Sequence, residues 1–128
     1  MIVSVIGLGY IGLPTAAILA KGDTQVVGVD INQEAVEMIN QGQIHIIEPE
    51  LEDLVYSAVQ SGNLTATIKP EKSDVFVIAV PTPFKGKNQP DLSFVKSAIL
   101  SISKVLEKGN LVILESTSPV GTTEKVVQ

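Results

Sequence analysis

A glycine-rich turn near the N-terminus is the feature that most constrains what this chain can fold into. Gly7, Gly9 and Gly12 form a G-x-G-x-x-G pattern between a β-branched apolar run at residues 2–6 and an Ala-rich helical pattern. A second apolar run ends at Asp30, 18 residues after Gly12. The hexapeptide alone is a weak signal. A strand before it, a helix after it and an acidic residue at this distance are together typical of a dinucleotide-binding turn.

Each glycine has a distinct physical task in such a turn. Gly7 permits the tight bend, Gly9 lets the backbone approach a pyrophosphate, and Gly12 lets the helix lie close to the sheet. The free N–H groups at the helix start then face the phosphates, aided by the helix dipole. The sequence therefore predicts that backbone groups, rather than cationic side chains, hold a doubly charged ligand. A turn that only bends the chain, in a domain that binds nothing, is the alternative.

Asp30 is placed to accept hydrogen bonds from the adenosine ribose hydroxyls of a dinucleotide. A carboxylate there repels the 2′-phosphate of NADP, whose accommodation usually involves a nearby Arg. The chain has nine cationic residues, all of them Lys, and no Arg. We therefore expect the cofactor to be NAD rather than NADP.

Apolar runs of strand length alternate with helical patterns along the whole chain. Strands are expected at residues 2–6, 25–30, 64–68, 74–80 and 111–114, the last two as buried strands. Helices are expected at residues 11–20, after an N-cap at Asn32, from residue 48 to Gly62, after an N-cap at Asp91, and at 122–128. This alternation predicts a doubly wound, mostly parallel α/β sheet of the Rossmann type, with helices on both faces in three αβα layers.

Length and composition exclude several classes of protein. With 128 residues, 45% of them hydrophobic, the chain has the size of one domain. Its net charge of −5 argues against a nucleic-acid partner held by phosphate contacts. The lack of Cys excludes disulfides, thiolate metal sites and a cysteine nucleophile within these residues. No targeting signal is recognisable and the apolar runs are too short to cross a bilayer, so we expect a cytoplasmic protein without membrane contact.

Two further segments are expected to border the cofactor crevice, because ligands of doubly wound sheets bind at the carboxyl ends of strands. Pro81 and Thr82 follow the run at 74–80, and Thr117 follows the run at 111–114. The two Thr hydroxyls either contact the cofactor or satisfy backbone groups in Pro-rich turns, and the sequence leaves both interpretations open. The polar loop at 84–90 is interpreted as a solvated surface loop rather than a lid.

The single His and an acidic cluster favour structural roles. His45 has no Cys or clustered carboxylates to complete a ligand set, so no metal site is expected. The cluster precedes and opens an expected helix, where carboxylates complement the helix dipole; it consists of Glu48, Glu50, Glu52 and Asp53.

Taken in order, several segments resemble the N-terminal domain of the UDP-glucose/GDP-mannose 6-dehydrogenase family. They are GLGYIGLP at 7–14, GVD at 28–30, EPEL at 48–51, VPTP at 80–83 and STSPVG at 116–121. The resemblance covers essentially the whole chain. Residues 44–49, 79–86 and 113–121 are most similar to the branch that acts on UDP-N-acetyl-D-mannosamine, and Glu115 stands where many UDP-glucose enzymes carry Lys.

The resemblance implies a four-electron, NAD-dependent oxidation of a nucleotide sugar's C6 alcohol to a carboxylate, with the aldehyde held on a Cys as a thiohemiacetal. Two hydrides pass in turn to NAD. Matching positions imply a role for six residues: Tyr10, Ile11, Asp30 and Thr82 as NAD contacts, Thr117 near the nicotinamide end as an auxiliary residue that orders a water, and Thr123 as a weaker cofactor contact.

The differences from the complete family members limit what this chain can do by itself. The nucleophilic Cys, its Lys and Asn partners and the sugar-binding domain lie outside it, so no catalytic residue is expected here. We expect residues 1–128 to be the NAD-binding domain of a longer, homodimeric dehydrogenase whose missing part binds the UDP-sugar. The family commonly has Gly where this chain has Glu50, which weakens any role carried over to residues 48–51.

Three alternatives remain open at this point. The domain could belong to another UDP-sugar dehydrogenase, such as a UDP-glucose 6-dehydrogenase. It could belong to a 3-hydroxyacid or 6-phosphogluconate type of dehydrogenase, which shares only the cofactor fold. It could also be a non-catalytic module that senses NAD.

Overall fold

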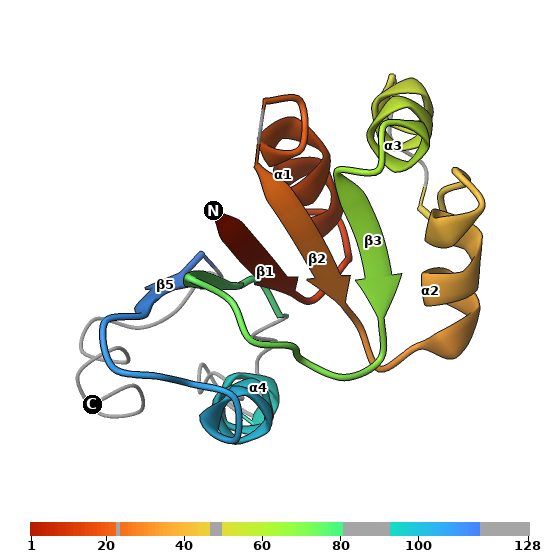
Figure 1. Cartoon of the computed structure of the whole chain (residues 1–128). Helices are drawn as coiled ribbons and strands as arrows, with labels where there is room; N and C mark the ends of the chain where they lie inside the picture. The colour runs from red at the N-terminus through yellow and green to blue at the C-terminus, as the bar shows by residue number, and fades with distance from the viewer. Residues whose placement is uncertain (23, 47–49, 81–92, 116–128) are drawn as a thin grey trace.

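The computed structural model describes residues 1–22, 24–46, 50–80 and 93–115. Five strands form one parallel sheet in the order β3-β2-β1-β4-β5 (Figure 1). The strands are β1 Ile2–Ile6, β2 Gln25–Val29, β3 Leu64–Thr67, β4 Val75–Ile78 and β5 Leu111–Leu114. The helices are α1 Gly12–Leu19, α2 Gln33–Asn40, α3 Leu51–Gln60 and α4 Ser93–Ser103. The predicted doubly wound α/β sheet is confirmed.

Helices cover both faces of the sheet, as the apolar runs predict. One core cluster joins β1 and β2 to α1, α2 and α3, and a second joins the opposite face of the sheet to α4. In Figure 1, α4 accordingly lies on the other side of the sheet from α1 and α3. The strand order runs in one direction from β1 to β3 and in the other from β1 to β4 and β5. The carboxyl ends of β1 and β4 therefore flank the switch point at which ligands of such sheets bind.

Local signals in the sequence correctly place both ends of α2 and the C-terminal end of α3. The side chain of Asn32 accepts a hydrogen bond from the backbone N–H of Ala35 at 3.2 Å and caps α2. Gly42 follows α2 with φ at 80° and Gly62 follows α3 with φ at 82°, conformations that favour glycine. The predicted N-cap Asp91 and the predicted helix at 122–128 lie outside the described residues. α4 ends at Ser103, although apolar residues continue at helical spacing as far as Leu106.

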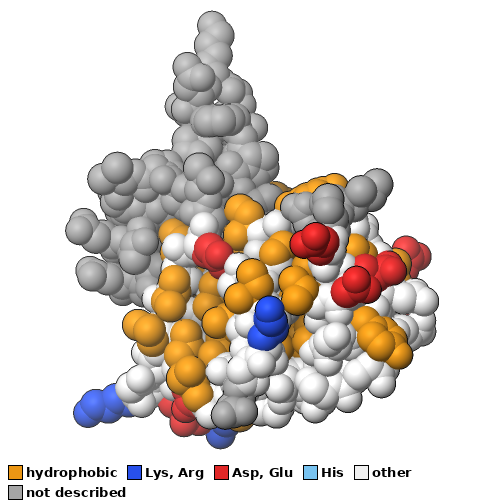
Figure 2. All heavy atoms as spheres, turned by 90° about the horizontal axis from the view of Figure 1, so that it is seen from above, with side chains coloured by type: hydrophobic (Ala, Val, Ile, Leu, Met, Phe, Trp, Pro, Cys, Tyr) orange, Lys and Arg blue, Asp and Glu red, His pale blue; other side chains and the backbone are white. Residues whose placement is uncertain are grey.

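β5 differs from the prediction of a buried strand. Val112 and Leu114 pack against the α4-side core, whereas Leu111 and Ile113 are 55% and 43% exposed on the other face. β5 is the edge strand of the described sheet, beside β4, and α1 lies over β1 and β2. In the view from above, hydrophobic side chains gather on the side of the surface where β5 lies in Figure 1 (Figure 2). An apolar tetrapeptide therefore indicates a strand without indicating that both faces are covered.

The residue before α3, Glu50, has an unusual backbone conformation. Glu50 precedes the helix with φ at 66°, and it is the only described residue other than glycine with a positive φ. A left-handed conformation costs a non-glycine residue free energy because its Cβ crowds the backbone. A glycine would adopt the same conformation without this cost. Glu52 and Asp53 occupy the first turn of α3, as the dipole interpretation predicts.

Among the described residues, no helix has the length and apolarity that crossing a membrane would require.

Candidate dinucleotide-binding site

The glycine turn has the geometry that its pattern predicts. Gly7 has φ at 98° and donates its N–H to the carbonyl of Val29 at 2.7 Å, which ties the turn to the end of β2. A Cβ on Gly12 would overlap the carbonyl oxygen of Gly7, because the helix start folds back onto the turn. A Cβ on Gly9 would meet nothing within 4 Å. The turn is thus tightly packed at its two ends and open at the middle glycine, where a ligand has room to approach the backbone.

Leu8 anchors the turn in the core and packs closely against Gly28, a packing role that the sequence did not reveal. The Leu8 side chain is fully buried and lies over Gly28 of β2. A Cβ at Gly28 would come within 2.9 Å of both terminal methyl carbons of Leu8. A glycine inside a strand pattern often marks such a close approach, so the signal was present in the sequence.

Asp30 holds the glycine turn and the start of α2 in place. Its Oδ2 accepts the backbone N–H of Leu8 at 2.9 Å, and its Oδ1 accepts the backbone N–H of Asn32 at 2.9 Å. Its own N–H donates to the carbonyl of Thr67 at 3.1 Å, at the end of β3. Each carboxylate oxygen has further lone-pair capacity, so both can still accept a ribose hydroxyl. The carboxylate is therefore oriented before any ligand arrives.

A cavity of about 600 Å³ opens at the carboxyl ends of β1, β2, β3 and β4, with α4 as its far wall. This volume lies in the range typical of small-molecule sites. The glycine turn contributes Gly7, Gly9, Tyr10 and Ile11, and β2 contributes Asp30 at its end. The remaining lining is almost wholly apolar or small: Ile6, Leu8, Val29, Ile31, Ile68, Pro70, Ala79, Val80, Phe94, Ser97, Ala98 and Ser101.

Several of these lining residues were missed by sequence reasoning. Ile31 is 88% exposed, and Ile68 and Phe94 are also exposed although they are large and apolar. Phe94, Ser97 and Ser101 share one face of α4 by helical spacing. That face carries no large buried side chain, but burial follows from the packing of the helix and gave no signal in the sequence.

The other predicted site residues divide into two groups. Tyr10 and Ile11 line the cavity with exposed side chains, and their contacts with NAD stay predictions. Pro81, Thr82, Thr117 and Thr123 lie outside the described residues, so their contacts stay predictions. At the adjoining strand ends, Ala79 and Val80 line the cavity.

A hydrogen bond connects the end of β5 to α1. The hydroxyl of Thr15 donates to Oε1 of Glu115 at 2.7 Å. Glu115 directly follows β5, so this contact brings the end of the edge strand beside the first turns of the helix that the glycine turn opens. Sequence reasoning did not pair these two residues, which are far apart in the chain.

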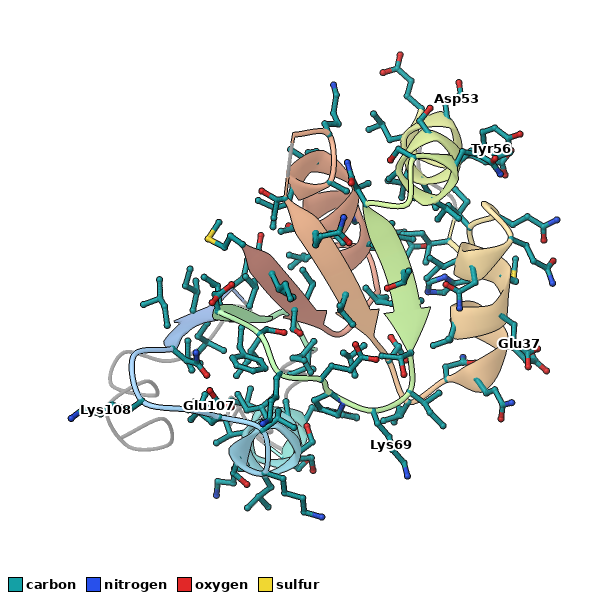
Figure 3. The ribbon with its side chains drawn as sticks, in the orientation of Figure 1. Glu37, Asp53, Tyr56, Lys69, Glu107 and Lys108 are labelled. Atoms are coloured by element: carbon teal, nitrogen blue, oxygen red, sulfur yellow. The ribbon has the colours of Figure 1, made fainter. Side chains whose placement is uncertain are left out.

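No described cationic side chain lines the cavity. Lys69 stands between two lining residues, Ile68 and Pro70, but it is exposed and points away from the sheet in Figure 3. Among the described residues, the part of the lining that a phosphate could approach is therefore the backbone of the glycine turn and the start of α1.

His45 lies apart from the cavity, in a small hollow beside α2 with Asn32, Glu34 and Met38. Its Nδ1 is buried and has no hydrogen-bond partner among the described residues. No group of three or more His, Cys, Asp or Glu side chains that could hold a metal ion occurs in the described part of the chain.

The parallel sheet, the glycine turn and the carboxylate at the end of β2 define a Rossmann-type dinucleotide-binding domain. The chain belongs to the UDP-glucose/GDP-mannose dehydrogenase family and constitutes its NAD-binding domain, since the family's sequence profile matches residues 1–128. Its cofactor is NAD.

Sequence relatives narrow the similarity further. Over 126 residues the chain is 61% identical to a UDP-N-acetyl-D-mannosamine dehydrogenase of Yersinia pestis, which covers 98% of this chain and 30% of that protein. It is 60% identical over 124 residues to an NDP-N-acetyl-D-galactosaminuronic acid dehydrogenase of Ralstonia nicotianae, covering 97% of this chain and 29% of that protein. The chain thus spans less than a third of the length of these relatives.

Solved structures of nucleotide-sugar dehydrogenases have the same fold over nearly the whole of this chain. A UDP-N-acetyl-mannosamine dehydrogenase from Staphylococcus aureus superposes with a TM-score of 0.95 at 44% identity, over 99% of this chain and 31% of that one. A ternary complex of GDP-mannose dehydrogenase from Pseudomonas aeruginosa superposes with a TM-score of 0.93 at 34% identity, again over 99% of this chain and 31% of that one.

Proposed function

We propose that this chain is the cofactor-binding part of a longer enzyme that oxidises UDP-N-acetyl-D-mannosamine at C6 to UDP-N-acetyl-D-mannosaminuronate. The observation that carries the proposal is the 61% identity to the Yersinia pestis dehydrogenase of that name over 98% of this chain. The 60% identity to a Ralstonia enzyme named for a different sugar favours a second candidate, another nucleotide-sugar dehydrogenase. A cofactor domain does not by itself select between sugars that the rest of the enzyme binds.

The proposed division of labour within the site follows from its geometry. The backbone around Gly9 and the start of α1 receives the pyrophosphate, with Tyr10 and Ile11 beside it. The Asp30 carboxylate accepts the ribose hydroxyls. Four residues are proposed as cofactor contacts on the family resemblance alone: Pro81, Thr82, Thr117 and Thr123.

The overall reaction consumes one alcohol, one water and two NAD⁺, and it yields one carboxylate, two NADH and protons. NAD supplies the hydride acceptor when bound. This chain's residues bind and orient it, while the nucleophile must come from the remainder of the enzyme because the chain contains no Cys. We further propose that the complete enzyme is a cytoplasmic homodimer.

Calorimetry on the 128-residue chain tests the cofactor part of this proposal. NAD is expected to bind measurably, and NADP at least about tenfold more weakly, because the Asp30 carboxylate repels a 2′-phosphate and no Arg is present to offset the repulsion. Equal affinity for the two cofactors would contradict the role given to Asp30.

A turnover assay tests the catalytic part. The isolated chain is expected to produce no NADH from NAD and UDP-N-acetylmannosamine, whereas the complete enzyme is expected to produce two NADH per sugar. Steady NADH production by the isolated chain would refute the proposed division of labour. A complete enzyme that prefers UDP-glucose would favour the second candidate.

A further inference from the structure

The order of the strands divides the cofactor crevice into two sides around the glycine turn. Asp30 follows β2 on one side, where the adenosine ribose is proposed to bind, and the turn proposed to receive the pyrophosphate follows β1 at the centre. A dinucleotide that extends across the turn then has its nicotinamide ring on the other side, over the ends of β4 and β5. β5 is three strands from β2, or about 14 Å at the usual strand spacing (Figure 1). The charge at the nicotinamide end is therefore set by other residues than Asp30.

Glu115 is the charged residue at the ends of β4 and β5 in the described part of the chain. β4 is followed by Ala79 and Val80, which line the cavity, and β5 is followed by Glu115. The backbone N–H of Glu115 donates to the carbonyl of Ile78 at 2.8 Å, so Glu115 lies level with the end of β4. Its side chain is exposed, and no ion pair neutralises it among the described residues.

Thr15 fixes the position of this carboxylate. Its hydroxyl donates to Oε1 of Glu115 at 2.7 Å, a charge-assisted hydrogen bond. Thr15 lies in the first turns of α1, so the bond holds the carboxylate beside the helix that starts at the glycine turn. A hydroxyl carries no net charge, so it orients the carboxylate without cancelling its charge.

We propose that Glu115, held in place by Thr15, makes this site favour NAD⁺ over NADH. The nicotinamide ring of NAD⁺ carries a positive charge that a nearby carboxylate attracts, whereas the ring of NADH is neutral. The pyrophosphate is the same in both, so its repulsion by the carboxylate cancels in the ratio of their dissociation constants. This preference suits an oxidation that takes up two NAD⁺ and releases two NADH per sugar. The inference rests on the proposed binding of NAD in the crevice.

Calorimetry with NAD⁺ and with NADH tests the proposal on the 128-residue chain and its Glu115→Gln variant, at about 50 mM NaCl, where screening is weak. Gln keeps an oxygen that accepts the Thr15 hydroxyl but removes the charge. The ratio of the NADH dissociation constant to the NAD⁺ dissociation constant is expected to fall by about two- to threefold, a modest factor because the carboxylate is exposed. A fall of less than twofold would overturn the proposal. If neither cofactor binds to the parent chain, the proposed function fails instead, which distinguishes the two failures.

Three further variants separate the position of the charge from its presence. Glu107→Gln is the matched control, because it removes an exposed carboxylate before the amino end of β5 and changes the net charge equally. It is expected to leave the ratio unchanged, and a fall equal to that of Glu115→Gln would overturn the proposal. Thr15→Val removes the hydroxyl that holds the carboxylate and is expected to lower the ratio, whereas Thr15→Ser keeps a hydroxyl and is expected to preserve it. A ratio that Thr15→Val leaves unchanged would overturn the positioning role of Thr15.

Discussion

Replacing Asp30 with Asn tests whether this residue builds the site as well as contacting the ligand. The carboxylate accepts one backbone N–H with each oxygen, from Leu8 in the glycine turn and from Asn32 at the start of α2. Asn is nearly isosteric but has one acceptor oxygen and one amino group. In either orientation, the amino group of Asn faces a backbone N–H, so two donors meet and one hydrogen bond is lost.

The size of the effect follows from these two bonds. A hydrogen bond to a charged group contributes about 1.5–3 kcal/mol to stability. Asp30 is partly exposed at the mouth of the cavity, so the lower part of that range applies. We expect Asp30→Asn to lower the free energy of unfolding of the ligand-free chain by about 1.5 kcal/mol. We also expect it to weaken NAD binding by about tenfold or more, because the turn loses an anchor and the ribose loses an acceptor.

Urea denaturation of the ligand-free chain measures the first effect, and calorimetry with NAD measures the second. Asp74→Asn is the matched control. Oδ2 of Asp74 accepts the backbone N–H of Ile2 at 2.8 Å, next to β4 and away from the cavity. It is expected to cost about 1 kcal/mol or less of stability, as an exposed bond does, and to leave the NAD dissociation constant unchanged.

The outcome that would refute the reasoning is specific. If Asp30→Asn weakened NAD binding while the unfolding free energy and the amide hydrogen exchange of residues 7–12 stayed unchanged, Asp30 would act on the ligand alone. Its two backbone bonds would then have no part in shaping the turn.

Two further predictions concern backbone geometry. Gly9→Ala is expected to change the unfolding free energy by no more than about 0.5 kcal/mol, because the added Cβ would meet no protein atom within 4 Å. It is expected to abolish measurable NAD binding, because the Cβ would occupy space that the pyrophosphate needs. Gly12→Ala, whose Cβ would overlap the carbonyl of Gly7, is expected to lose both NAD binding and more than about 2 kcal/mol of stability; equal unfolding midpoints for the two variants would contradict this. Glu50→Gly is expected to raise the unfolding free energy by about 1 kcal/mol by removing a left-handed Glu, whereas the control Glu52→Gly, inside α3, is expected to lower it by about 0.5–1 kcal/mol. A Glu50→Gly variant no more stable than the parent in urea denaturation would show that the left-handed residue carries no strain.

The parts of this fold that could be predicted from the sequence are those in which a short sequence pattern determines one backbone geometry. A G-x-G-x-x-G turn after a strand has essentially one geometry, and Gly7 and Gly12 adopt it. The ends of α2 could be predicted for the same reason. Asn32 accepts a backbone N–H in the first turn, and Gly42 adopts the positive φ that ends the helix, so each signal acts within one turn.

The parts that could not be predicted depend on neighbours distant in the chain. The apolar tetrapeptide at β5 has one open face because nothing in the described chain covers Leu111 and Ile113. The cavity wall on α4 is defined by where that helix crosses the strand ends, which its own sequence does not encode. The second role of Asp30, as an anchor for Leu8, required the turn and the end of β2 to be placed in three dimensions.

The dependence of NAD binding on salt tests the idea that backbone groups hold the pyrophosphate. Lysine and arginine side chains bind phosphate as exposed charges, whose attraction is strongly screened as ionic strength rises. Backbone N–H groups at a helix start act at contact distance and carry only partial charge, so screening weakens them less. No described Lys lines the cavity, and the side chain of Lys69 points away from the sheet (Figure 3). We therefore expect the NAD dissociation constant to change less than about threefold between about 50 and 500 mM NaCl. A change of more than about tenfold would mean that cations outside the described residues, such as Lys85 or Lys87, carry the phosphate binding, and Lys85→Gln and Lys87→Gln variants would then flatten the dependence.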